Sequence, residues 1–221
     1  MHDTVDKIIS IKKEIQEKIT QDKLINYNPN IVAVSKTFPM SNILPLINYG
    51  HDHFGENKVQ ESLEKWTDIK NDFKHIKLHM IGKLQTNKVK YVISLFDYIH
   101  SLDNLKLAEK ISNEQVKKNK KIKIFIQINI GNEMQKSGIA PEKLKNFYKI
   151  CTEDLNLDII GLMCLPPQNL NQEKYFFEML NLSKIVKLND LSMGMSHDYQ
   201  KALQYNATFL RIGSKIFGER N

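Results

Sequence analysis

The sequence predicts an α/β fold, a single (β/α)8 TIM barrel with an extra N-terminal helix. Short apolar runs alternate with segments of helical period along the whole chain. Eight such runs occur, and parallel strands need helical crossovers between them, which favours a closed barrel over an open sheet. No GxGxxG fingerprint follows the first run, which argues against a dinucleotide-binding sheet.

The expected elements follow one another in a regular order. A helix is predicted over residues 3–20, where isoleucines recur at helical spacing. The eight predicted strands lie at residues 31–35, 53–55, 76–81, 98–100, 122–130, 157–163, 191–193 and 208–212. Helix-patterned stretches separate them, for example residues 105–116, 141–151 and 172–186. No linker or break in composition interrupts this order, so residues 1–221 are predicted to form one domain.

The charge balance says little about partners. The chain carries 32 Lys+Arg against 25 Asp+Glu, a net charge of +7, and its only arginines are Arg211 and Arg220. The lysines are dispersed, and the densest run, residues 117–123, joins a predicted helix end to a strand, where cations complement the helix dipole. A nucleic-acid binder with steeply salt-dependent affinity is an alternative, but no patch interleaves aromatic and basic residues. We therefore expect no nucleic-acid partner.

Targeting and cysteine usage point to a cytoplasmic protein. The N-terminus is acidic with no apolar run after it, so no secretory signal is expected. No stretch approaches the roughly 20 apolar residues of a membrane span. Cys151 and Cys164 show neither CxxC spacing nor a histidine cluster beside them. We expect reduced, structural thiols, no metal site and no membrane partner.

Lys36 is the candidate covalent residue. It directly follows the apolar run at residues 31–34, so its amine is expected at the carboxyl-end rim of the barrel, where barrel enzymes build their sites. A lysine in a partly apolar, cation-rich pocket can have a lowered pKa and form a Schiff base with a carbonyl compound. The alternative is a surface lysine, as most of the 30 lysines must be.

Small polar residues follow the seventh and eighth predicted strands. Barrels often bind phosphate in the loops after these two strands, through backbone N–H groups at a helix start. Ser196, Gly213 and Ser214 occupy those loops. Ser196 could equally be the N-cap of the helix-patterned segment that follows it. A Schiff-base lysine together with a phosphate cradle suggests pyridoxal 5′-phosphate (PLP).

Several segments in order resemble one known family. They are Ala33–Thr37, Phe54–Glu61, His79–Lys88, Gln127–Ile130, Lys136–Gly138, Gly161–Met163, Leu191–Asp198 and Arg211–Arg220. From Ile31 onward the sequence resembles the pyridoxal phosphate homeostasis proteins, a PLP-binding family. The resemblance implies a fold-type III PLP barrel, similar to the barrel domain of alanine racemase. Two residues depart from the family pattern: many members carry an aromatic residue in place of Lys58 and a tryptophan in place of Leu78. Local packing is expected to differ at these two positions.

The resemblance also implies a role for each candidate residue. Lys36 would carry the Schiff base, and Arg211 would face the pyridine nitrogen. The remaining cofactor-binding residues would be Ser196, Gly213 and Ser214 at the phosphate and Asn57 near the cofactor. His79 and Ser192 would be either site residues or polar groups of the barrel core. No residue is assigned a catalytic role.

The expected function is to buffer or deliver PLP, as part of vitamin B6 and amino-acid homeostasis, without strong catalysis. Arginine stays protonated, so Arg211 would keep the ring nitrogen unprotonated and the ring a poor electron sink. Alanine racemase takes its second base from a C-terminal domain, and the chain stops a few residues after the eighth strand. The expected partners are PLP and, by extension, apo PLP-dependent enzymes, with the protein a monomer.

Two other activities remain open from the sequence. One is a PLP-dependent amino-acid racemase, and the other is a lysine-based aldolase that forms a Schiff base with its substrate. Lys136 follows the fifth strand in a loop with two glycines, so it is either a secondary PLP site or an ordinary solvent-exposed lysine.

Overall fold

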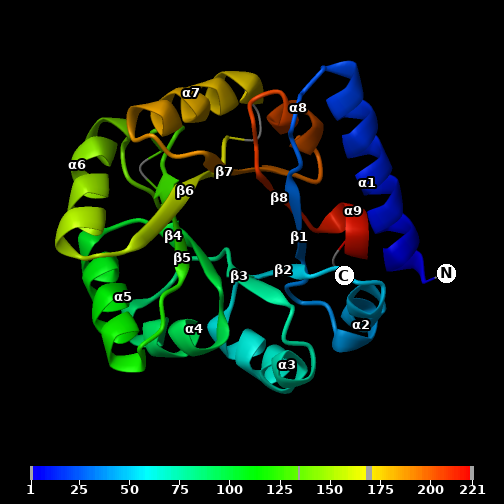
Figure 1. The fold of residues 1–221 in the computed structure, drawn as a ribbon, viewed down its shortest axis with the longest axis horizontal. Coiled ribbons are helices and arrows are strands. Elements are labelled where there is room, and N and C mark those ends of the chain that lie inside the picture. The colour runs from blue at the N-terminus through cyan, green and yellow to red at the C-terminus, as the bar shows by residue number, and fades with distance from the viewer. Residues whose placement is uncertain (1, 134, 168–170, 220–221) are drawn as a thin grey trace.

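The barrel expected from the sequence is confirmed. The structure, a computed structural model, describes residues 2–133, 135–167 and 171–219, so Arg220 lies outside the described residues. Within this part, eight parallel strands close into a barrel in chain order, with the last strand paired to the first. Figure 1 shows the helices arranged around this ring of strands.

The strands lie close to the predicted positions. They are β1 (Asn30–Val34), β2 (His53–Glu56), β3 (Lys77–Met80), β4 (Tyr98–Leu102), β5 (Lys123–Ile128), β6 (Asp158–Cys164), β7 (Asp190–Met195) and β8 (Phe209–Ile212). Most of their residues are buried on both faces, because helices cover the outside and side chains fill the inside. Such strands read as continuous apolar runs, which is why the sequence located them.

One helix follows each strand, after a helix at the N-terminus. They are α1 (Asp3–Gln21), α2 (Met40–Asn48), α3 (Val59–Asp72), α4 (Val89–Leu95), α5 (Leu105–Lys118), α6 (Leu144–Lys149), α7 (Gln172–Ile185), α8 (Tyr199–Leu203) and α9 (Ser214–Phe217). The expected helix at 141–151 is less regular than predicted. It begins as a 3-10 turn at Pro141–Lys143 and ends as a π-helical turn at Ile150–Asp154.

The N-terminal helix completes the outer ring. Ile8, Ile11, Ile15 and Ile19 are buried on one face of α1, as their spacing predicts. The helix packs against α2, α8 and α9, as Figure 1 shows. Because α9 has only four residues, α1 covers the part of the barrel wall that a longer helix after β8 would cover.

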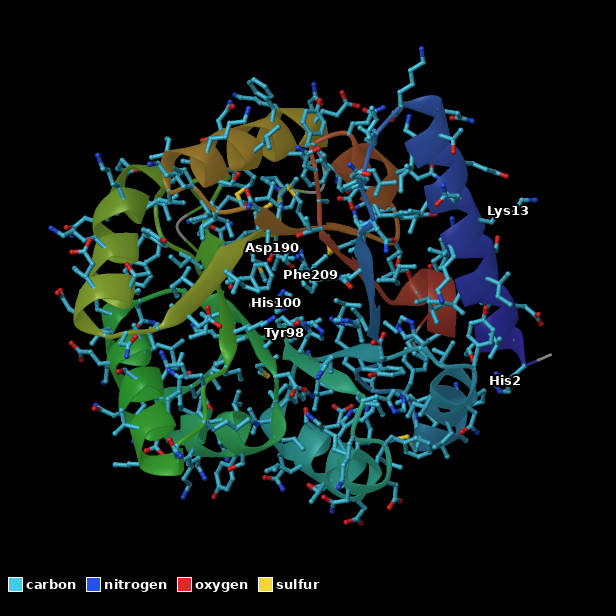
Figure 2. The ribbon with its side chains drawn as sticks, viewed as in Figure 1. His2, Lys13, Tyr98, His100, Asp190 and Phe209 are labelled. Carbon is cyan, nitrogen blue, oxygen red and sulfur yellow. The ribbon has the colours of Figure 1, made fainter. Side chains whose placement is uncertain are left out.

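Side chains fill the inside of the barrel. Val32, Tyr98, Phe125, Met163 and Phe209 form a buried cluster within the ring of strands, separate from the larger core between strands and helices. Tyr98 and Phe209 lie near the centre of the ring in Figure 2. The barrel is therefore closed below its carboxyl-end rim, and a ligand site can open only above this packing.

Three smaller expectations can be checked in the fold. Cys151 and Cys164 are free and buried, and burial raises the pKa of each thiol to about 12, which suits structural thiols. The basic run joins α5 to β5, where Asn119 ends the helix in a left-handed conformation. No helix among the described residues is long and apolar enough to span a membrane.

Candidate functional site

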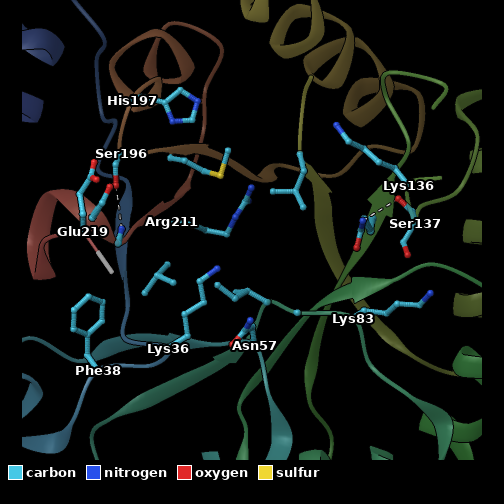
Figure 3. Close-up of a pocket in the computed structure, with 18 of the residues that line it drawn as sticks. Lys36, Phe38, Asn57, Lys83, Lys136, Ser137, Ser196, His197, Arg211 and Glu219 are labelled. Carbon is cyan, nitrogen blue, oxygen red and sulfur yellow. Dashed lines mark hydrogen bonds between the residues drawn. The ribbon is translucent and has the colours of Figure 1, made fainter. Parts of the chain in front are cut away.

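All six residues predicted to bind the cofactor line one cavity of about 790 Å³. They are Lys36, Asn57, Ser196, Arg211, Gly213 and Ser214. They come from the carboxyl ends of β1, β2, β7 and β8, and because parallel strands end at the same rim of a barrel, residues distant in sequence meet there. Figure 3 shows Lys36, Asn57 and Arg211 extending into this space.

Asn57 is held by a close approach of two loops. It follows β2, and Gly82, which follows β3, lies so near that a Cβ at this glycine would overlap the Asn57 backbone. The side-chain Oδ1 of Asn57 is buried and has no hydrogen-bond partner among the described residues. An unsatisfied buried polar atom is costly, and Asn57 carries this cost at the cavity wall.

Ser196 joins the loops that follow β7 and β8. The backbone N–H groups of Gly213 and Lys215 both donate to Ser196 Oγ, at 3.2 and 3.3 Å. The interpretation of Ser196 as a helix N-cap is wrong: Asp198 is the N-cap residue of α8, and its carboxylate accepts the Met195 N–H at 2.5 Å. The Ser196 hydroxyl is instead directed at two amides that converge on one oxygen.

Arg211 lies at the bottom of the cavity and is only 4% exposed. Its Nη1 donates to Ser192 Oγ at 2.5 Å, and its Nη2 donates to the Cys164 carbonyl at 2.8 Å. Burial lowers the pKa of Arg211, but a guanidinium stays protonated at neutral pH. These two bonds fix the orientation of a positive charge at the cavity wall.

A chain of buried polar side chains continues from Arg211 into the barrel. Ser192 Oγ lies 2.8 Å from His100 Nδ1, His100 Nε2 lies 2.9 Å from His79 Nδ1, and His79 Nε2 lies 2.8 Å from His53 Nδ1. His79 and Ser192 are thus polar groups of the barrel interior, one of the two possibilities left open by the sequence.

The histidines of this chain are neutral. Burial lowers the pKa of His79 and His100 well below the usual value. The positive charge of Arg211 lowers the pKa of His100 further, and protonating His79 beside a protonated His100 would be opposed by like-charge repulsion. The pKa of His53 is also lowered, chiefly by burial. A neutral imidazole donates at one ring nitrogen and accepts at the other, so the bonds of one histidine determine those of the next.

Comparison with known proteins places the chain in a family. The family model described as "Alanine racemase, N-terminal domain" matches residues 14–221. The pyridoxal phosphate homeostasis protein of Aquifex aeolicus is 40% identical over an alignment of 199 residues that covers 86% of each chain. That of Haemophilus influenzae is 38% identical over an alignment of 221 residues that covers 94% of this chain and 93% of its own. The chain belongs to the pyridoxal phosphate homeostasis protein family.

A solved structure extends the comparison to three dimensions. PipY of Synechococcus elongatus, determined with PLP bound, is 29% identical with a TM-score of 0.78 and covers 92% of this chain and 100% of its own. The same protein without PLP gives a TM-score of 0.82. The family resemblance inferred from the sequence motifs is confirmed.

The two departures from the family pattern fall outside the cavity. Leu78 is fully buried in the main core on β3. Lys58 is exposed directly before α3. Neither residue lines the cavity, so the packing difference expected at these positions does not alter its wall.

Two more lysines line the cavity. Lys136 forms an ion pair with Glu133 in the loop after β5, and Lys83 follows β3. Figure 3 shows both with Lys36 around the cavity. The hypothesis that Lys136 is a secondary PLP site is thus compatible with its place, and it stays a prediction.

Several lining residues were not proposed from the sequence. They include Phe38, Gln127, Ser137 and His197. Gln127 Nε2 donates to the Ser137 carbonyl at 2.9 Å and so ties β5 to the loop after it. Gln127 and Phe38 lie at or just after the carboxyl ends of strands. The criterion that identified the other positions, a place at the carboxyl end of a predicted strand, could therefore have included them.

Proposed function

We propose that this protein binds PLP in the cavity through a Schiff base to Lys36, and that it buffers or delivers the cofactor. The observation that carries the proposal is the convergence of Lys36, Arg211 and the Ser196 loop in one cavity. The names of the relatives, which describe homeostasis proteins, and the PLP-bound structure of PipY support the same function.

The residues of the cavity fit the functional groups of PLP. The hydroxyls of Ser196 and Ser214, which line the cavity together with Gly213, are suited to a phosphate dianion. The N–H groups of Gly213 and Lys215 donate to Ser196 Oγ and so hold this hydroxyl in the loop. Asn57 lines the same cavity and would lie beside the cofactor. We propose that these residues, with Lys36 and Arg211, hold the cofactor.

Arg211 is the reason to expect a binding protein. A bound PLP supplies an aldehyde for the Schiff base and a pyridine ring that can withdraw electrons. With two N–H groups fixed by Ser192 and the Cys164 carbonyl, the guanidinium would donate another to the ring nitrogen. A permanently protonated donor keeps that nitrogen without its own proton, which weakens electron withdrawal and carbanion chemistry.

The decisive experiment is the absorbance spectrum of the purified protein with added PLP. The wild-type protein should show a visible band of the Schiff base, and Lys36→Ala should lack it. Lys83→Ala removes another cavity-lining lysine and should keep the band. A wild-type protein that stays colourless with PLP would contradict the proposal.

Borohydride reduction separates the remaining assignments. Reduction followed by peptide mass spectrometry should place the phosphopyridoxyl label on Lys36. An additional label on Lys136 would support the secondary site, and its absence would remove that hypothesis. An adduct of a substrate carbonyl without a phosphate-bearing pyridine would instead indicate the lysine-based aldolase.

The match to the alanine racemase N-terminal domain makes a racemase the second candidate. It predicts turnover of alanine or serine enantiomers at about 1 s⁻¹ or faster, an ordinary enzyme rate. The proposed binding protein should be far slower.

We further infer that residues 1–221 act as one monomeric domain in the reducing cytoplasm. There the protein would transfer PLP to apo PLP-dependent enzymes.

A further inference from the structure

The turn that carries Lys36 has an unfavourable backbone. Thr37, directly after Lys36, adopts a left-handed conformation with φ of 69°. A β-branched residue pays a steric penalty there, because its side chain crowds the neighbouring carbonyl. Such a conformation persists only where surrounding contacts determine it. The contacts that hold this turn therefore also set the position of Lys36.

Helix α3 supplies those contacts. The Nζ of Lys65 donates to the Ser35 carbonyl at 2.9 Å and to the Phe38 carbonyl at 3.2 Å, on either side of Lys36 and Thr37. The Thr37 N–H donates to Glu61 Oε1 at 2.6 Å. One turn of α3 thus binds three backbone groups of the four-residue segment 35–38.

The same lysine is anchored in the core. Lys65 Nζ lies 2.9 Å from Glu56 Oε1 and 3.0 Å from Glu61 Oε1, and its side chain is 13% exposed. Glu56 is fully buried and also accepts the Ser35 hydroxyl at 2.7 Å and the Trp66 Nε1–H at 3.0 Å. A charge bound to a buried, hydrogen-bonded carboxylate has little freedom to move.

We propose that Lys65 is a positioning residue for Lys36. Lys65 does not line the cavity, so it would not touch the ligand. It holds the carbonyls on both sides of Lys36, and so determines where the Lys36 amine stands relative to a PLP aldehyde. This inference rests on the proposed function and goes beyond it, because it assigns the reactivity of Lys36 to a helix outside the cavity.

The expected consequence is kinetic. Schiff-base formation joins the Lys36 nitrogen to the aldehyde carbon and releases the aldehyde oxygen with the two amine hydrogens as water. The rate depends on how closely the amine is held to its line of attack, and a displacement of about 1 Å can cost about 100-fold. Loosening the turn should therefore slow this reaction about 10- to 100-fold.

The test uses variants that avoid leaving a lone charge in the core. Lys65→Met alone would strand the buried Glu56 carboxylate, so it is combined with Glu56→Gln, whose amide oxygen can still accept from Ser35 and Trp66. Glu56→Gln alone is the baseline. Lys70→Met is the matched control, because Lys70 lies on the same helix, is 17% exposed, and binds the Leu95 carbonyl and Asp97 instead.

Two ligands distinguish a misplaced Lys36 amine from a damaged cavity. Stopped-flow absorbance follows Schiff-base formation with PLP, and calorimetry measures binding of pyridoxine 5′-phosphate, which has an alcohol in place of the aldehyde. The Lys65→Met/Glu56→Gln protein should form the Schiff base about 10- to 100-fold more slowly than the Glu56→Gln protein, with unchanged affinity for the alcohol. Lys70→Met should change neither quantity, and thermal melts confirm that all variants are folded at the assay temperature.

The outcomes are distinct. A wild-type protein that forms no visible band overturns the proposed function itself. A double variant that reacts as fast as Glu56→Gln, while the wild type forms the band, overturns the role of Lys65 alone. Equal weakening of both ligands also overturns it, since the contacts would then support the whole cavity. Glu61→Leu, which removes the acceptor of the Thr37 N–H, should slow the reaction in the same direction.

Discussion

The two ends of the barrel interior are built from the same strands but have opposite character. At the carboxyl end, the strands open into a cavity of about 790 Å³, whose wall includes Lys36 and Arg211. Below it, side chains close the interior completely: His79 stacks on Tyr98 with ring centroids 4.2 Å apart, and His100 stacks on Phe125 at 4.3 Å. Figure 2 shows Tyr98, His100 and Phe209 near the centre of the ring of strands.

This difference shows how the fold separates binding from stability. At the carboxyl end, Asn57 Oδ1 has no hydrogen-bond partner among the described residues, whereas the polar side chains of the lower layer form one continuous hydrogen-bonded chain. Arg211 belongs to both regions, because it lines the cavity and binds the top of the histidine chain through Ser192. Changes in the two regions should therefore have different consequences.

The largest effect is expected where the two regions meet. Arg211→Leu should lower PLP affinity at least tenfold, because the ring nitrogen loses its hydrogen-bond donor. It should also lower the free energy of unfolding by about 1–3 kcal/mol, because Ser192 Oγ and the Cys164 carbonyl lose the hydrogen bonds that they accept from the guanidinium. Absorbance titration and urea unfolding measure the two quantities. An effect on only one of them would mean that Arg211 serves one region alone.

Acid should act on the buried histidines of the barrel and of the loop before β2. Burial lowers the pKa of His51 from 6.5 to about 4, and the pKa values of His53, His79 and His100 are lowered as well. Below pH 6.5 the unfolded chain therefore binds more protons than the folded one, so the free energy of unfolding falls as the pH falls. This stability is fully present above pH 6.5, and His51 alone should account for a loss of up to about 3 kcal/mol by pH 4.

Urea unfolding between pH 7.5 and pH 4.5 measures this dependence. His51→Gln should make the curve shallower, since an amide has no proton to gain. A stability that is constant between pH 6.5 and pH 4.5 would contradict buried histidines that are neutral in the folded protein.

His79→Leu tests the independence of the two regions most directly. It removes the middle of the chain, so His53 and His100 each lose a partner, and the free energy of unfolding should fall by about 1–3 kcal/mol. PLP affinity should stay within about twofold, since His79 does not line the cavity. The exposed His75, changed to leucine, is the control and should alter stability by less than about 0.5 kcal/mol. A large loss of affinity in His79→Leu would show that the lower layer shapes the cavity.

The smallest effect is expected at the N-terminal helix. Glu14 on α1 accepts hydrogen bonds from Lys215, Tyr199 and Gln200, which ties α1 to α8 and α9. The group is partly exposed, so Glu14→Ala should cost about 1 kcal/mol or less and leave PLP affinity nearly unchanged. A tenfold loss of affinity would mean that α1 holds the phosphate loop in place.

The sequence located the strands and six lining residues for a local reason. The strands appear as apolar runs, and residues such as Lys36 and Arg211 stand at the ends of those runs. Their mutual approach then follows from the parallel barrel itself, since all strands end at one rim. The helix at 141–151 was predicted, but the π-helical turn at its end was not, because such a turn has no distinct residue pattern.

Other features depended on the tertiary structure. The histidine chain joins residues as far apart as His100 and Ser192, 92 positions along the chain, and only the register of the strands brings their ring and hydroxyl atoms within 2.8 Å. The role of Lys65 likewise requires α3 to pack beside the turn at Lys36, with Lys65 lying 30 residues from the Ser35 carbonyl that it binds.

By itself, the sequence determined the barrel and six of the residues around its cavity, because periodicity and strand ends are local properties. The tertiary structure decided that Ser196 binds two amides instead of capping α8, and that His79 belongs to the interior. It also decided that α1 covers the gap beside the short α9. These outcomes depend on distances between separate elements, which are fixed only when the strands close into a ring and the helices pack around them.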